Sequence, residues 1–116
     1  MIDGAHPFIG VDELGFYHWV VMERGQVLQD RQTTDRDELL YWSFETTTST
    51  MAQRWALHHP VEAQEQRVTK WIKQLQLLHK LNPDWARRRR DELVRSIKDV
   101  PGGIPPLPQP PPTSGA

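Results

Sequence analysis

The histidines are the side chains best suited to acid–base or metal chemistry, and their spacing does not gather them into a site. His58 and His59 are followed by Glu62 and Glu65, which could supply nitrogen and oxygen ligands to a metal. No further ligand follows at a metal-binding spacing, and the pattern His-Glu-x-x-His is missing. We therefore interpret these histidines as solvated or capping residues and expect no metal.

An enzymatic function is not indicated by any other pattern. The chain has no cysteine, and its seven glycines never form a phosphate-cradling loop. Catalysis requires a nucleophile, a base and an electrophilic partner in one cleft, and no group of residues suggests that combination. We expect a protein that is not an enzyme and that has no catalytic residues and no cofactor.

Four consecutive arginines, from Arg87 to Arg90, form the most basic segment. On a helix they spread around most of the circumference, so they cannot all face one phosphate backbone. Asp84, Asp91 and Glu92 lie at spacings that allow salt bridges to them. The formal net charge of the chain is −1, whereas nucleic-acid-binding domains usually carry a basic excess. We expect a solvated helix face and no nucleic-acid partner.

Charge is unevenly distributed along the chain. Residues 1–50 contain nine acidic and three basic residues, whereas residues 51–116 contain six acidic and 11 basic ones. Such asymmetry usually produces two surfaces of opposite sign and nothing more, but the acidic half also offers a surface to a basic partner.

Length and composition favour one small domain in the cytoplasm. The chain has 116 residues, and the expected domain, residues 1–100, can bury a single core. The five tryptophans suggest a core of few, bulky side chains. No stretch approaches the roughly 18 apolar residues of a membrane span, and the first residues do not resemble a secretion signal.

The N-terminal third is expected to form a β-hairpin. We interpret residues 1–14 as mostly loop and residues 15–31 as two antiparallel strands. The first strand is rich in aromatic and β-branched residues, Gly25 supplies the turn, and the second strand is more polar. A lone hairpin is marginal in water, so it must pack on helices or pair with further sheet from the N-terminal segment.

The first helix is expected over residues 35–57, with a cap at Thr34 or Asp35. Residues 46–50 are rich in threonine, which disfavours a helix. We predict a continuous helix because the apolar phase is kept across this stretch. The apolar stripe predicted to face the core consists of Leu40, Phe44, Thr47, Met51 and Trp55.

Two further helices are expected over residues 60–81 and 83–98. Pro60 can open the first of them, and Asn82 can cap the second. The predicted core stripe of the first is Val68, Trp71, Ile72, Leu75 and Leu78, with Lys70, Lys73, Gln74 and Gln76 on the solvent side. The predicted inner side of the second is Trp85, Arg89, Leu93, Val94 and Ile97.

Residues 101–116 are dominated by proline and are expected to form a disordered tail with polyproline II character. A P-x-x-P pattern between Pro105 and Pro108 is frequent in such tails, so we favour a tail that does not bind. The predicted fold class is therefore α+β, with a small N-terminal antiparallel hairpin or sheet packed on about three helices.

The remaining candidate is a protein-binding surface on the first helix. Aromatic residues beside charged ones are typical of protein interfaces, although at least half of these aromatics are expected to be core residues. The candidate partner-binding residues are Glu23, Arg24, Asp37, Glu38, Tyr41, Trp42, Glu45 and Trp55.

Several of these segments resemble a known family. The stretches from Tyr17 to Gly25 and from Asp37 to Phe44, together with Ala52, are similar to bacterial polymorphic-toxin immunity proteins of the type numbered sixty-three. The segments 74–78 and 81–85 fit the helical end of the same pattern. The resemblance covers about residues 15–93.

The resemblance implies a small cytoplasmic protein that binds and neutralises a cognate toxin domain. One departure lies before the segment 74–78, where the family pattern has an acid, paired bases and phenylalanine. This chain has Glu65, Gln66, Arg67 and Val68 there, followed by Trp71. The alternative from a different class is a nucleic-acid-associated or regulatory adaptor that uses the run from Arg87 to Arg90 and the proline-rich tail.

Overall fold

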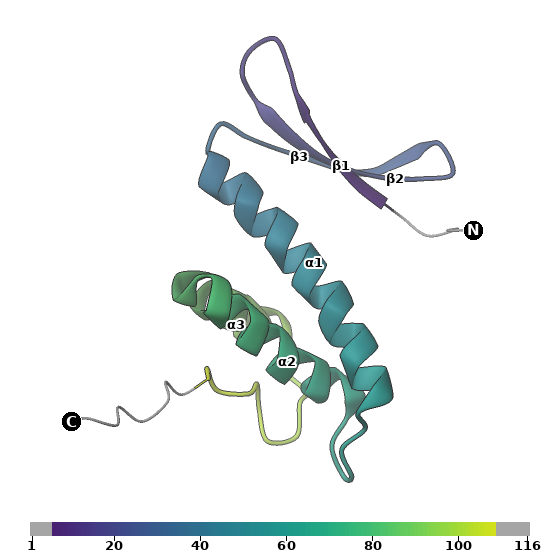
Figure 1. Cartoon of the computed structure of the whole chain (residues 1–116), viewed down its shortest axis with the longest axis vertical. Coiled ribbons are helices and arrows are strands. Elements are labelled where there is room, and N and C mark those ends of the chain that lie inside the picture. The colour runs from purple at the N-terminus through teal and green to yellow at the C-terminus, as the bar shows by residue number, and fades with distance from the viewer. Residues whose placement is uncertain (1–5, 109–116) are drawn as a thin grey trace, which may run out of the picture. The chain divides into compact units, whose positions relative to one another are not determined.

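The computed structural model describes residues 6–108, apart from the side chain of His6. Within this range, three strands precede three helices (Figure 1), which confirms the α+β class. The chain divides into two compact units, residues 1–43 and 44–116, with the division inside the first helix. The elements are β1 His6–Val11, β2 Tyr17–Glu23, β3 Gln26–Thr33, α1 Arg36–His58, α2 Gln66–Leu81 and α3 Pro83–Ser96.

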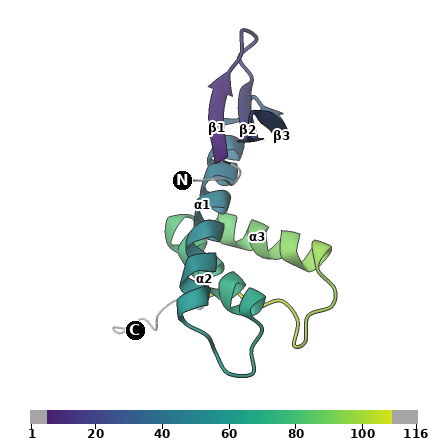
Figure 2. The same ribbon diagram turned by 90° about the vertical axis from the view of Figure 1, so that its right-hand side faces the viewer.

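The strands form one antiparallel sheet in the order β1-β2-β3 (Figure 2). The expectation that residues 1–14 are mostly loop is wrong for His6–Val11, which pairs along β2 from His6 opposite Met22 to Val11 opposite Tyr17. Pro7 and Gly10 indicated a loop, but proline is tolerated on an edge strand, where its missing N–H is not needed. Residues 1–5 lie outside the described part of the chain.

Two turns set the register of the sheet. Between β1 and β2, the Asp12 carboxylate accepts hydrogen bonds from the backbone N–H of Leu14 at 2.9 Å and of Phe16 at 3.0 Å. Between β2 and β3, Arg24 and Gly25 have positive φ angles of 51° and 79°, as a two-residue turn with the twist of a hairpin requires. The prediction of a hairpin that turns at Gly25 is confirmed.

The buried side chains of the first unit come from β2 and from the start of α1. They are Trp19, Val20, Leu39, Tyr41 and Trp42. The Asp35 carboxylate accepts a hydrogen bond of 2.9 Å from the Asp37 N–H and so caps α1, as predicted. The guanidinium of Arg31 on β3 lies 5.3 Å from the centroid of the Trp42 ring, an interaction that ties β3 to the first turns of α1.

Helix α1 continues through its threonine-rich stretch, as predicted. The Thr48 hydroxyl donates to the Phe44 carbonyl at 2.7 Å, and the Thr50 hydroxyl donates to the Thr46 carbonyl at 3.2 Å. These hydroxyls, which can otherwise compete with the helix, are therefore bonded to carbonyls of the helix itself.

The prediction of which face of α1 is buried is wrong. Met51, expected in the core, is 52% exposed. In the second unit the buried residues of α1 are instead Thr48, Ala52 and Ala56, with exposures of 3%, 0% and 2%. They lie one position further along the chain than the predicted stripe, a rotation of about 100°. Small side chains permit close approach of a neighbouring helix, whereas the sequence pattern favoured the larger residues.

The boundaries of α2 and α3 agree with the predictions at three of four ends, within two residues. Helix α2 begins at Gln66, not at Pro60, because residues 60–65 form a turn in which Ala63 has a φ of 63°. Asn82 caps α3 by accepting a hydrogen bond of 2.9 Å from the Asp84 N–H. On α3, Ala86 and Leu93 are buried, whereas Val94, expected on the inner side, is 40% exposed.

Residues 101–108 follow a defined path where a disordered tail was expected. The Gly103 N–H donates to the Val100 carbonyl at 2.9 Å, and the Arg90 Nε donates to the Pro105 carbonyl at 2.9 Å. Pro105 is buried. Residues 101–108 therefore contact α3, whereas a free tail would be surrounded by solvent. Residues 109–116 of the predicted tail lie outside the described part of the chain.

The buried stripe of small residues predicts that enlarging Ala52 destabilises the protein. We expect Ala52→Leu to lower the free energy of unfolding by about 1–3 kcal/mol, because the added methylene groups overfill a site that is already fully buried. Urea unfolding followed by tryptophan fluorescence measures this change. The exposed neighbour supplies the control, since Met51→Ala should change stability by less than about 1 kcal/mol. Equal effects of the two substitutions would contradict the assigned phase.

Candidate functional site

The candidate residues in the first unit lie in three environments. Glu23 ends β2 and Arg24 lies in the turn to β3, and both line a hollow of about 300 Å³ with Gln26 and Leu28. Asp37 and Glu38 lie in the first turn of α1, where carboxylates suit the helix dipole, and the Asp37 side chain is exposed.

Tyr41 and Trp42 are core residues of the structure, with exposures of 2% and 9%. Tyr41 lay outside the predicted apolar stripe, so the error in the phase of α1 also misplaced this residue. The aromatic surface expected around these two residues is therefore not present at these positions.

The candidate residues in the second unit are already engaged with neighbouring side chains. The Glu45 carboxylate lies 3.4 Å from Arg89 Nη1. The Trp55 ring stacks on His59, with centroids 4.2 Å apart and an angle of 10° between the planes. Lys73 Nζ lies 4.9 Å from the centroid of the same ring. Trp55 is thus held rigidly but remains partly exposed.

A buried polar network joins the three helices of the second unit. Gln74 is 0% exposed, although its polarity had placed it on the solvent side of α2. Its Nε2 donates to the Glu45 carbonyl at 3.0 Å and to the Thr48 hydroxyl at 3.3 Å. Its Oε1 accepts a hydrogen bond of 3.3 Å from Arg89 Nε.

Spacing alone contained a signal for this network. Gln74 lies three positions after Trp71 and four before Leu78, so it shares their face of the helix. Across the described residues, every buried side-chain nitrogen or oxygen has a hydrogen-bond partner. The network therefore leaves no polar atom available to a ligand.

The four arginines of α3 are used within the protein. Arg87 pairs with Asp84 at 2.7 Å, and Arg88 pairs with Glu92 at 3.4 Å. Arg89 belongs to the buried network, and Arg90 binds the Pro105 carbonyl. The predicted pairing at helical spacings is confirmed for Asp84 and Glu92. These contacts favour a structural role for the arginine run over recognition of phosphates.

A second polar cluster lies on the sheet. His18 Nε2 is 2.8 Å from the Asp12 carboxylate, and His18 Nδ1 is 2.9 Å from the Asp30 carboxylate. The hydrogen bond that the His18 ring donates to the Asp12 carboxylate, followed by the one it donates to the Asp30 carboxylate, raises the pKa of His18 above its ordinary value of 6.5. The same bond to His18 lowers the pKa of Asp12 below its ordinary value of 3.8. No nucleophile joins them among the residues 6–108, so the cluster acts as a clamp between loop and strands.

Neither a metal site nor a membrane span is found in the part of the chain that the structure describes. No three histidine, aspartate or glutamate residues there are arranged to hold a metal ion. No helix there is both long and apolar enough to cross a bilayer.

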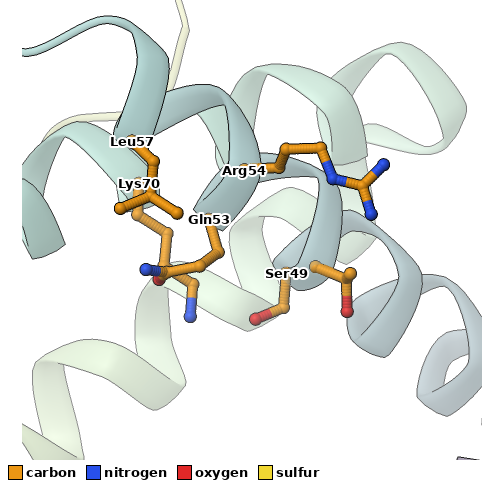
Figure 3. Close-up of a pocket in the computed structure, with 6 residues that line it drawn as sticks. Ser49, Gln53, Arg54, Leu57 and Lys70 are labelled. Atoms are coloured by element: carbon orange, nitrogen blue, oxygen red, sulfur yellow. The ribbon is translucent and has the colours of Figure 1, made fainter. Parts of the chain in front are cut away.

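A further hollow, of about 370 Å³, lies on one side of α1. Leu57 of α1 and Lys70 of α2 line it together with Ser49, Thr50, Gln53 and Arg54. The Arg54 guanidinium extends away from Lys70 (Figure 3), so the two cations do not converge on one anionic ligand.

A different groove, of about 310 Å³, lies between α1 and α2 on another side of α1. Its lining consists of Phe44, Thr47, Thr48, Met51, Leu77, Lys80 and Leu81. This lining includes three of the five residues that the sequence placed in the core, so the predicted stripe forms a surface feature.

The comparisons with known proteins agree with the resemblance noted in the sequence. Residues 12–95 match the model of the family described as Immunity protein 63. No curated protein and no solved structure matches the chain significantly.

The buried network generates a prediction about stability. We expect Gln74→Leu to lower the free energy of unfolding by about 1–3 kcal/mol, because the Glu45 carbonyl and Arg89 lose a partner. The exposed Gln76 on the same helix provides the control, since Gln76→Leu should be nearly neutral. Urea unfolding of both variants measures the difference. If they are equally stable, the network does not hold the helices together.

The sheet cluster generates a prediction about pH. A raised pKa in the folded state means that charged His18 contributes its full stabilisation below pH 6.5 and loses it as the pH rises through the raised value. The Asp12 contribution is present above pH 3.8 and is lost as the pH falls through the lowered value.

Wild-type protein should therefore lose stability as the pH rises from about 6.5 through the raised pKa of His18, relative to His18→Gln, which lacks the titrating group. Urea unfolding across this range measures the difference, and His58→Gln, at an exposed position, serves as the control. A wild-type profile that is parallel to that of His18→Gln would exclude the clamp as a source of stability.

Proposed function

The chain belongs to the Immunity protein 63 family, and we propose that it neutralises a toxin protein by binding directly to it. The family match over residues 12–95 is the observation that carries this proposal. The toxin would be the cognate domain of a bacterial polymorphic toxin, and neutralisation would take place in the cytoplasm, where the toxin acts.

The physical requirements of such an inhibitor are modest. It needs a rigid scaffold and a complementary surface, and it does not need catalytic groups. The satisfied network around Gln74 supports a rigid scaffold, because a buried amide with several partners fixes how the helices pack. The partly exposed Trp55, held by His59 and Lys73, is a side chain of the type that dominates binding energy at interfaces.

Charge supports a basic partner for the N-terminal unit. Residues 6–43 contain seven acidic and three basic residues, and Asp37 is exposed at the start of α1. A surface of one sign accelerates encounter with a surface of the opposite sign, an effect that salt screens. We therefore propose that Glu23, Asp37 and Glu38 attract a basic toxin domain.

The first test is protection in cells. Expression of the toxin domain encoded beside this gene should arrest growth, and co-expression of this chain should restore it. The two proteins should also co-purify in a fixed ratio. If co-expression gives no protection and no complex forms between the purified proteins, the proposal of direct neutralisation is wrong.

Charge reversal tests the electrostatic part. The double variant Glu23→Lys, Asp37→Lys should associate with the toxin about ten times more slowly at low salt, with a smaller difference at high salt. Stopped-flow or surface plasmon resonance measures the association rate. Asp91→Lys, an exposed acid on α3, is the matched control. An unchanged low-salt rate for the double variant would rule out steering by these acids.

A further inference from the structure

The groove between α1 and α2 combines apolar walls with exposure. Met51 and Leu81, which both line it, are each 52% exposed. The Thr48 hydroxyl, also in the lining, is bonded to the Phe44 carbonyl inside the helix. The groove of about 310 Å³ thus offers mainly hydrocarbon to a partner.

The exposure of Met51 is not explained by the packing of the helical unit. The buried residues of α1 in this unit are Thr48, Ala52 and Ala56, and the Thr48 hydroxyl accepts a hydrogen bond from Gln74 of α2. Phe44, Met51 and Trp55 recur at helical spacing on an adjoining face. Exposed apolar side chains that gather around a groove, here Met51 and Leu81, indicate a surface that another molecule covers.

The walls of the groove are fixed in advance. Phe44 stacks on Trp85 of α3, with ring centroids 5.4 Å apart. Trp55, one helical turn beyond Met51, stacks on His59. Rigid aromatic residues next to an apolar groove lose little conformational entropy on binding, which favours affinity.

The charge next to the groove is positive. Lys80 lines it and has no side-chain partner in the described part of the chain. Lys73 lies over Trp55. Among the described residues no acid lines the groove, and the nearest acid on α1, Glu45, is paired with Arg89. The surface is therefore complementary to a segment with apolar anchors and acidic flanks.

We propose that this groove is the docking site for an amphipathic helix of the toxin, with apolar anchors toward Met51, Leu77 and Leu81 and an acidic residue toward Lys80. The inference rests on the proposed function and names the surface and the chemistry of the partner. A helix fits because a groove between two helices accepts side chains spaced at i, i+3 or i+4 and i+7. A second copy of this chain fits less well, because its own groove would bring lysines to lysines.

The test compares two matched variants on α1 in the full chain. Met51→Asp places a charge in the apolar groove, whereas Leu57→Asp places one at a residue 59% exposed that lies outside this groove and lines the separate hollow of about 370 Å³. Calorimetry with the purified toxin domain should show at least about 30-fold weaker binding for Met51→Asp, the loss typical of a central interface residue. Leu57→Asp should bind like wild type, and urea unfolding should show that both variants are folded.

Charge exchange tests the orientation of the partner. Lys80→Glu should weaken binding, and exchange of the contacting acid on the toxin helix for lysine should restore it. Wild-type affinity in Met51→Asp, with wild-type protein still binding and protecting, would overturn the groove while leaving the proposed function intact. No binding by wild-type protein would overturn both. A dimer of the wild-type chain that Met51→Asp converts to a monomer would assign the groove to a second copy instead.

Discussion

The helical unit depends on a buried amide that all three helices must satisfy. Gln74 of α2 donates to the Glu45 carbonyl and the Thr48 hydroxyl of α1 and accepts from Arg89 of α3. A buried polar group without partners costs about 1–3 kcal/mol. Sliding or rotating any one helix would incur that cost. The main effect of the amide is therefore to select one arrangement of the three helices, and its contribution to stability is secondary.

This arrangement determines which side chains remain for recognition. Gln74 requires α2 to face the side of α1 that presents Thr48, and Ala52 and Ala56 on that side are buried. The larger residues, including Met51, are turned to the edge of the contact and stay partly in solvent. The same constraint thus packs the unit and creates the apolar groove.

The arginine run illustrates how tertiary contacts change the meaning of a charge pattern. Helical spacing spreads the four adjacent cations around the helix, and the sequence therefore predicted a solvated face with salt bridges to nearby acids. In the structure, each has an internal partner, from Asp84 to the Pro105 carbonyl. The contact with Pro105 also gives residues 101–108 a defined path, although proline-rich composition favours disorder.

Local chemistry in the sequence determined the kinds of elements, the turn at Gly25 and the caps at Asp35 and Asn82. It also determined the continuity of α1 and the family resemblance. All of these features depend on residues that lie close together in the chain. Only the tertiary structure decided which stripe of α1 is buried, that Gln74 is internal, that His6–Val11 joins the sheet and that Tyr41 is a core residue. Burial depends on which surface another element covers. Two adjoining stripes of α1 have the same spacing in the sequence, so spacing cannot tell which of them is buried. The position of α2 decides it, because the Gln74 amide of α2 needs hydrogen-bond partners on α1.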